Sequence, residues 1–461
     1  MAFLFPDQGI TKGLINFRSP EWFDQYLAFR KDHPLSLDLP DPEKLGFSEE
    51  QLNNIPSLRH PLYTMLLHSG LIYGFPFLYP FRPHPPGKMG TRWTTKLVLV
   101  DMILHSVLSD LTARDGAGAD YAAHLKEAAA LIRTYYRGIM TAHSGVDDRS
   151  IEHLLADRVT FHRNWLDWRR TGINTHLFWD WYFFRKYLRM AIEGKAPESV
   201  DFQALLEEKK AMKWLTMELI AAAAHCDARL KRREKVLEHH FEKSSHFFSP
   251  KEKDRLHRVF REGLTLDQLH FPESADWTVR RYWLDISLLV LYSDKEIQAP
   301  EEAFLETLCQ KLALSDDELL ESKLALGGFL LRFGRKIPFI SSRKSSMALI
   351  AQALGQNFAK MKKATHAEYK ETLEMADTLG RLMQHQLGIA KGKDLPSEEE
   401  IAAAFDQIKD LPKFLPFFTM VFLPVPGVTE MYILLAYSIE RMSGESIRLL
   451  PSNFSKMVKG K

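Results

Sequence analysis

Apolar residues recur along most of the chain at intervals of three and four, the spacing that places them on one face of an α-helix. Between Thr91 and Met190 this pattern predicts a buried helix followed by an alanine-rich one at Tyr121–Met140. Residues 1–90 are interrupted by prolines, with a short helix expected to use Ser19 as its cap and a buried helix expected within Met65–Phe81. The pattern predicts an all-α, multi-domain protein.

Aromatic residues are densest towards the end of the second region, and we expect them to form a core because aromatic rings bury large areas. An interfacial belt or a partner groove is the alternative. The patch comprises Trp165, Trp168, Phe178, Trp179, Trp181, Tyr182, Phe183, Phe184 and Tyr187. His153 and Asp157 are four residues apart, with His162 and His176 nearby, and we expect structural histidines here rather than a metal site.

The segment Met212–Ala325 contains an internal repeat. An offset of 67 residues pairs Asp227 with Asp294 and Glu234 with Glu301. Each half reads as an apolar helix, a charged turn and an amphipathic helix, and each ends in a capping box. The boxes are Ser249 with Glu252 and Ser315 with Glu318. Such a unit buries its apolar face against its own copy.

The turn of the second half, YSDKEIQAPEE, resembles the acidic turn of TerB-like tellurite-resistance domains, which are all-helical modules built from such a repeat. The resemblance implies a divalent cation, calcium or magnesium, bound by Asp294, Glu296, Glu301 and Glu302. Carboxylate oxygens are suitable ligands for such hard cations. The alternative is that Asp294 starts the turn and that Glu301 and Glu302 stabilise the N-terminus of a helix opened by Pro300.

Residues 322–367 contain no acidic side chain but many basic ones interleaved with aromatics. Lys323 is the first basic residue of this stretch. The candidate lipid-binding residues are Arg332, Arg335, Lys336, Arg343, Lys344, Lys360, Lys362 and Lys363. Each basic residue near an anionic leaflet contributes about 1 kcal/mol to binding. Anionic membrane lipid is the expected partner, while a nucleic acid or ribosome and a merely solvated basic face remain alternatives.

The most apolar stretch of the chain is Phe414–Ile439, which is long enough to enter a bilayer and whose one acidic residue is Glu430. Pro424, Pro426 and Gly427 interrupt it, so we expect two half-helices joined by a bend, in a hydrophobic hairpin. Basic residues flank both ends of this apolar stretch, which favours placing the two ends in the same compartment. The hairpin is expected to be re-entrant or buried on the protein's own helices.

This stretch also carries a family resemblance. Pro416-Phe417, Pro424, the following acidic residue and the closing LLPSNF resemble the membrane-segment motif of the LETM family, the mitochondrial inner-membrane cation-exchange proteins and their bacterial relatives. The overall layout is similar to that of LETM-related biofilm-associated proteins. The resemblance implies association with a membrane and a role in cation homeostasis or in envelope and biofilm stress.

Composition narrows the function classes. The 461 residues carry a net charge of +2, so there is no global attraction to nucleic acid. Two cysteines, Cys226 and Cys309, without metal-type spacing indicate a reducing compartment, and the N-terminus lacks the features of a signal peptide. No phosphate-binding loop, nucleophile elbow or zinc-protease motif is present, so a non-enzymatic protein is expected.

The expected domains are a proline-punctuated segment (1–90), a helical aromatic-rich domain (91–200), a TerB-like domain (205–330), a basic arm with amphipathic helices (331–410) and the hydrophobic hairpin with a basic tail (411–461). The expected function is that of a non-enzymatic, cytoplasmic protein at the inner membrane, with a cation-sensing TerB-like domain. A soluble cytoplasmic scaffold or interaction protein, whose hairpin is buried in its own core, is the alternative.

Overall fold

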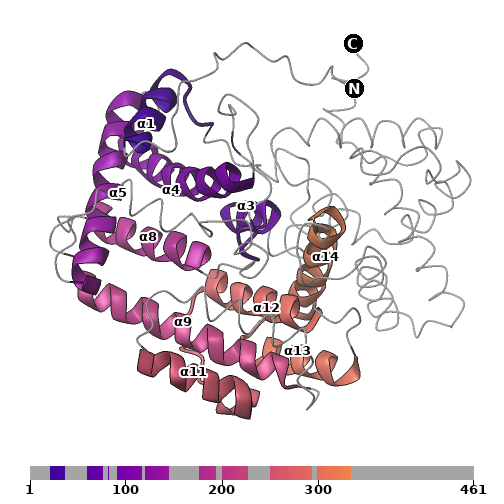
Figure 1. Ribbon diagram of the computed structural model, residues 1–461. Coiled ribbons are helices and arrows are strands. Elements are labelled where there is room, and N and C mark those ends of the chain that lie inside the picture. The colour runs from indigo at the N-terminus through magenta and orange to yellow at the C-terminus, as the bar shows by residue number, and fades with distance from the viewer. Residues whose placement is uncertain are drawn as a thin grey trace, which may run out of the picture. The chain divides into compact units, whose positions relative to one another are not determined.

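The computed structural model describes residues 21–36, 60–75, 81, 91–116, 120–144, 176–193, 200–226, 250–292 and 298–333. All regular secondary structure within these ranges is helical, as the hydrophobic pattern predicts (Figure 1). The predicted basic arm beyond Phe333 and the C-terminal hairpin lie outside the described residues.

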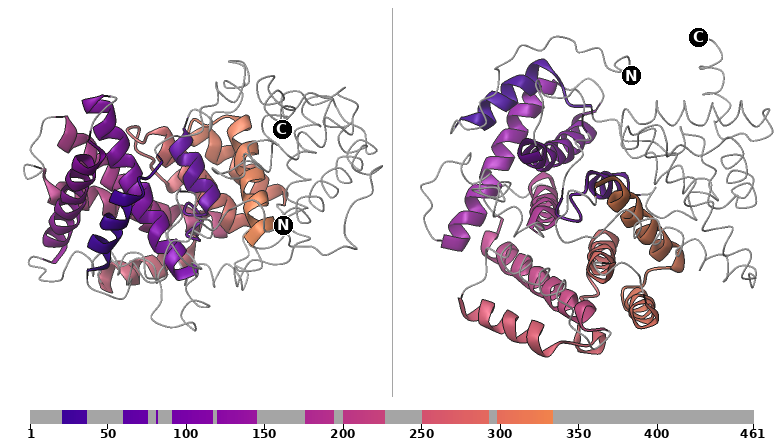
Figure 2. Two further views of the ribbon diagram at one scale, coloured as in Figure 1. Left: turned by 90° about the horizontal axis from the view of Figure 1, so that it is seen from above. Right: turned by 45° about the vertical axis from the view of Figure 1, so that its right-hand side comes forward.

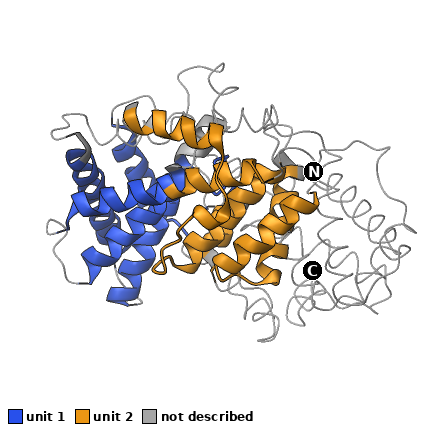
Figure 3. Ribbon diagram, turned by 90° about the horizontal axis from the view of Figure 1, so that it is seen from below, with its two compact units in different colours: residues 1–38, 69–214, 240–250 blue, residues 39–68, 215–239, 251–461 orange. Residues whose placement is uncertain are grey.

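The chain divides into two compact units that take alternating segments of the sequence (Figure 3). The first unit comprises residues 1–38, 69–214 and 240–250, and the second comprises 39–68, 215–239 and 251–461. One boundary falls inside helix α9 (Phe202–Ala224), so this continuous helix contributes residues to both units.

In the first unit the central element is α4 (Thr91–Asp115), which packs against α5 (Tyr121–Ser144) and α8 (His176–Ile192). Helix α1 (Trp22–Asp32) packs against α5. Every residue of α4 from Leu97 to Leu108 is buried, including the polar ones. The predicted apolar helix and alanine-rich helix are thereby confirmed.

The start of α1 corrects one prediction. The helix begins at Trp22 with Glu21 at the N-cap position, and no side chain caps it. Ser19 was expected to supply that cap, which is wrong because the first helical turn starts too far along the chain for Ser19 to occupy the N-cap position. The helix also runs on to Asp32, farther than the short apolar run alone indicates.

The predicted aromatic core is present on α8. Phe178, Trp179, Trp181, Phe183, Phe184 and Tyr187 are buried. Trp165 and Trp168 lie outside the described residues. Tyr187 also meets the ring of Phe202 at the start of α9, with the ring centroids 5.6 Å apart. Packing of the α8 aromatics therefore organises this part of the first unit.

In the second unit the central element is α12 (Trp277–Leu291), which packs against α13 (Ala299–Lys311) and α14 (Asp316–Phe333). The short η3 (Leu266–Gln268) contacts α13. Helix α11 (Pro250–Glu262) begins where the first capping box predicts a helix start. Helix α3 (Pro61–Ser69), most of which belongs to this unit, lies beside α14 (Figure 2).

No described helix combines the length and the hydropathy needed to cross a bilayer. Residues 411–461, on which the membrane prediction rests, lie outside the described helices.

The contact between Gly138 and Phe202 in the first unit gives a first testable prediction. A Cβ atom on Gly138 would lie 2.5 Å from three ring carbons of Phe202. Although alanine favours a helix over glycine by about 1 kcal/mol, overpacking costs about 1–3 kcal/mol. We therefore expect Gly138→Ala to lower the free energy of unfolding, measured by urea denaturation.

The matched control is the same substitution in a Phe202→Leu background, where the smaller side chain leaves room for the methyl group. There Gly138→Ala should be neutral or stabilising, and a double-mutant cycle measures the difference. Equal effects in both backgrounds would show that the ring does not limit this position.

Candidate functional site

The predicted metal-binding turn leads into α13, whose N-terminus is well defined. Gln298 occupies the N-cap position, Pro300 stands in the first turn, and Glu301 completes a capping box. The backbone N–H of Gln298 donates to Oε2 of Glu301 at 2.7 Å. The Glu301 side chain is buried and serves the helix N-terminus, as the capping alternative predicts.

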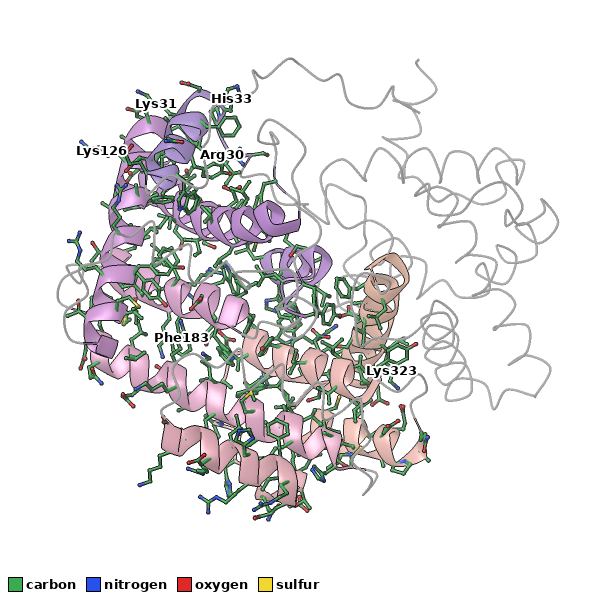
Figure 4. All side chains as sticks on the ribbon, viewed as in Figure 1. Arg30, Lys31, His33, Lys126, Phe183 and Lys323 are labelled. Carbon is green, nitrogen blue, oxygen red and sulfur yellow. The ribbon has the colours of Figure 1, made fainter. Side chains whose placement is uncertain are left out.

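Glu302 faces a different partner. Its carboxylate accepts a hydrogen bond from Nζ of Lys323 on α14 (Figure 4), and both side chains are largely shielded from solvent. Lys323 belongs to the basic, partly amphipathic stretch that was expected to contact lipid. For Lys323 that expectation is wrong, because its ammonium group is enclosed between α13 and α14, where Glu302 neutralises it.

The other two predicted ligands, Asp294 and Glu296, lie outside the described residues. Within the described ranges, no group of three or more histidine, cysteine, aspartate or glutamate side chains is arranged to hold a metal ion. The cation site therefore stays a prediction, and of its four ligands Glu301 and Glu302 already have partners within the protein.

The second capping box also forms and adds a tertiary contact. The backbone N–H of Ser315 donates to Oε2 of Glu318 at 2.6 Å, and the backbone N–H of Glu318 donates to Oγ of Ser315 at 3.2 Å. The other carboxylate oxygen of Glu318 accepts from the indole of Trp277. The cap of α14 is thereby tied to the start of α12.

A group of buried ionisable side chains in the described part of the second unit surrounds Asp285 of α12. Arg281, one helical turn earlier, places Nε 3.5 Å from Oδ2 of Asp285. Its NH1 donates to Oε2 of Glu321 on α14 at 2.8 Å. The hydroxyl of Tyr63 on α3 donates to Asp285, and all four residues are buried. We call Tyr63, Arg281, Asp285 and Glu321 the Asp285 cluster.

The electrostatics of this cluster follow from burial and charge. Burial alone would lower the pKa of Arg281, but Asp285, Glu321 and Tyr63 reverse this, so the guanidinium stays charged. Burial raises the pKa of Asp285, while Arg281 and the Tyr63 hydroxyl oppose that shift. The cluster thus holds a permanent positive charge beside two acidic groups.

The first unit contains a comparable arrangement on its own central helix. Asp101 of α4 accepts hydrogen bonds from the Tyr26 hydroxyl and from NH2 of Arg30, the latter at 3.0 Å. Arg30 and Asp101 are fully buried, and Figure 4 shows Arg30 on α1. A second buried ion pair joins Lys209 of α9 to Asp180 of α8. These pairs connect helices to one another.

Sequence reasoning did not identify these clusters, although a signal was present. Asp101 interrupts the apolar run LVLVDMILH, and Asp285 interrupts WLDISLLV. A charge in such a run must be paired when the helix is buried on all sides. The partners cannot be read from the run itself, because Tyr26 precedes Asp101 by 75 residues and Tyr63 precedes Asp285 by 222.

Cys309 is a poor candidate for a nucleophile. It is buried in α13, and burial raises the pKa of its thiol to about 12. At neutral pH the group is a thiol rather than the reactive thiolate. Its role here is packing.

The remaining predicted residues are only partly placed. His176 starts α8, and Arg332 lies in the last turn of α14. The following lie outside the described residues: His153, Asp157, His162, Arg335, Lys336, Arg343, Lys344, Lys360, Lys362, Lys363, Pro424, Pro426, Gly427 and Glu430. The lipid-binding surface and the hairpin remain predictions.

Comparison with known proteins finds no matching family model, curated protein or solved structure. The likeness to the LETM and TerB-like families therefore rests on the motifs quoted above.

The Asp285 cluster predicts that Arg281 is essential for stability. Arg281→Met keeps much of the side-chain volume but removes the guanidinium that pairs with both Asp285 and Glu321. Breaking such a pair costs about 3–5 kcal/mol, which we expect as a loss in the free energy of unfolding at pH 7, measured with urea.

The matched control is Arg261→Met on α11, where the side chain is 74% exposed and pairs with its neighbour Glu262. Its effect should stay within about 0.5 kcal/mol. If both substitutions had the same small effect, Arg281 would not be compensating buried charge.

Proposed function

We propose that the chain is a non-enzymatic helical protein that associates with the cytoplasmic face of an anionic inner membrane and acts in cation homeostasis or in envelope and biofilm stress. The observation that carries the proposal is the sequence of residues 411–454, a proline-bent apolar segment preceded by the basic stretch of residues 322–367. Basic residues near an anionic leaflet and an apolar segment inserted into it reinforce each other's binding.

A scaffold role rather than catalysis is supported by how the described polar groups are used. The buried charges of Arg30, Asp101, Arg281 and Glu321 each form an ion pair between helices. The buried thiol of Cys309 is protonated at neutral pH. These groups stabilise the contacts between helices, and membrane attachment is assigned to the C-terminal segments.

A TerB-like duplication is supported by two features of the second unit. Helices α9 and α12 end at Ala224 and Leu291, which are separated by the repeat offset. The indole of Trp283 donates to the hydroxyl of Thr216 at 3.0 Å, and these residues are also 67 positions apart. Equivalent positions meet in this way where two copies pack about a twofold axis.

Sedimentation with lipid vesicles tests the membrane proposal. We expect the full chain to bind vesicles that contain an anionic lipid more strongly than neutral vesicles, and to lose this preference at high salt. Changing Arg343 and Lys344 to Gln should weaken binding by about 2 kcal/mol, roughly 30-fold, because each basic residue contributes about 1 kcal/mol. The matched control changes Arg255 and Arg258, two exposed residues of α11.

Truncation after Asp410 separates the proposal from its alternative. If residues 411–461 insert into lipid, the shortened chain should remain folded and lose vesicle binding. The alternative predicts that the full chain binds neither anionic nor neutral vesicles and that the truncation unfolds it. In that case the C-terminal segment belongs to the protein's own core, and the chain is a soluble scaffold.

The predicted cation site is tested by titrating the full chain with calcium or magnesium in a calorimeter. Binding should release or absorb heat and stabilise the fold by about 2.7 kcal/mol when the free cation reaches a hundredfold excess over Kd. Replacing Asp294 and Glu296 with Ala should abolish both effects. Replacing the exposed Asp267 should not, and the absence of any response in the original chain would exclude the site.

A further inference from the structure

The ion pair between Glu302 and Lys323 brings a buried positive charge to the acidic turn of the second unit. Only 5% of the Lys323 side chain is exposed, and its ammonium group donates to Oε1 of Glu302. Lysine is rarely buried unless its charge is paired. The two residues are 21 positions apart in sequence, and the bond joins α13 to α14 (Figure 4). Lys323 is therefore built into the contact between these two helices.

The two glutamates at the start of α13 have different tasks. Both stand in the first turn of the helix, where negative side chains are favoured because the backbone N–H groups of a helix N-terminus point towards them. Glu301 caps the helix by accepting a hydrogen bond from the backbone N–H of Gln298. Glu302 holds Lys323 through Oε1, and its Oε2 is shielded from solvent. Glu302 thus already binds a cation, which is the ammonium group of a lysine.

A divalent cation at Glu302 would compete with this lysine. Calcium lies about 2.3–2.6 Å from the carboxylate oxygens that bind it, and magnesium lies closer still. An ammonium group bonded to the same oxygen would then be only a few ångströms from the metal ion, and two positive charges at such a separation repel each other. The ammonium group and a divalent cation therefore exclude one another at Oε1 of Glu302.

We propose that Lys323 is the resident cation of Glu302, that it closes the contact between α13 and α14 without a metal ion, and that a divalent cation gains Glu302 as a ligand only by displacing Lys323. The inference rests on the cation site of the proposed function and is independent of membrane binding. Because Lys323 is the first basic residue of residues 322–367, its displacement would act at the start of the proposed lipid-binding stretch.

A double-mutant cycle in the full chain tests the metal-free contact. Glu302→Gln and Lys323→Met each remove one of the two charges, and the melting temperatures are measured in an excess of chelator. Each single substitution should lower the melting temperature, and the double substitution should lower it by less than the sum of the two. Additive effects would overturn the proposal, and so would a fall in the melting temperature of the original chain on addition of the chelator.

Titration of the full chain with calcium in a calorimeter tests the competition. Lys323→Met should bind calcium at least about tenfold more tightly than the original chain, because the substitution removes a positive charge next to Glu302. Lys323→Arg keeps that charge and should retain the original affinity. The matched control is Lys311→Met, which removes a lysine of α13 that pairs with the exposed Asp267 at 3.0 Å and should leave the affinity unchanged.

The original chain and Lys323→Met give separate answers. Tighter binding by Lys323→Met supports the proposal even where the original chain binds no calcium, a result that would remove cation sensing from the proposed function. Equal affinities would overturn the competition and leave the cation site standing. The absence of binding by Lys323→Met would overturn the proposal as well. Should Lys323→Met fail to fold, Lys323→Gln replaces it, because glutamine keeps an N–H donor for Glu302 without the charge.

Discussion

The need to pair buried charge governs how both units are built. Among the described residues, α4 in the first unit and α12 in the second are buried along most of their length, and each of these helices carries an aspartate within its apolar run. An ionised carboxylate without partners is too costly to bury. The neighbouring helices must therefore bring donors to Asp101 and Asp285, and this requirement restricts how they pack.

Some of these hydrogen-bond donors lie on two short helices near the N-terminus of the chain, α1 and α3. Helix α1 has 11 residues and α3 has 9, lengths at which an isolated helix is marginal in water. Tyr26 and Tyr63 give each of them a buried hydrogen bond to the central aspartate of its unit. Apolar packing alone would tolerate a shift of either helix by a residue, whereas a hydrogen bond to one carboxyl oxygen would not.

Local sequence signals predicted the helices and several of their ends. The capping box of Ser315 and Glu318 and the first-turn position of Pro300 both depend on residues within one helical turn. The expected cap at Ser19 was wrong because the pattern did not locate the first turn of α1. Lys323 was misplaced because its partner Glu302 belongs to another helix. Partners that are distant in sequence depend on the tertiary fold, which no short pattern contains.

Two acidic residues of the predicted metal-binding turn already have partners within the protein. Glu301 uses one carboxylate oxygen to cap α13, and Glu302 neutralises the enclosed Lys323. A divalent cation that recruited Glu302 would have to break its buried ion pair with Lys323. Any cation bound here therefore depends chiefly on Asp294 and Glu296, and Lys295 adds a positive charge between those two ligands.

The central helices also bear on how Glu430 should be interpreted. An acidic residue in an apolar run is a functional candidate if the run lies in a membrane. Yet Asp101 and Asp285 occupy similar runs and are accommodated inside the protein by tyrosine and arginine. An isolated acid is therefore no evidence for lipid in this chain. The feature that distinguishes residues 411–461 is the proline break, which α4 and α12 lack, because basic residues flank the apolar runs of those two helices as well. Proline at membrane depth frees backbone groups that must find partners in protein or water, so the bend at Pro424 and Pro426 is the point at which insertion into lipid would require the most support from the rest of the molecule.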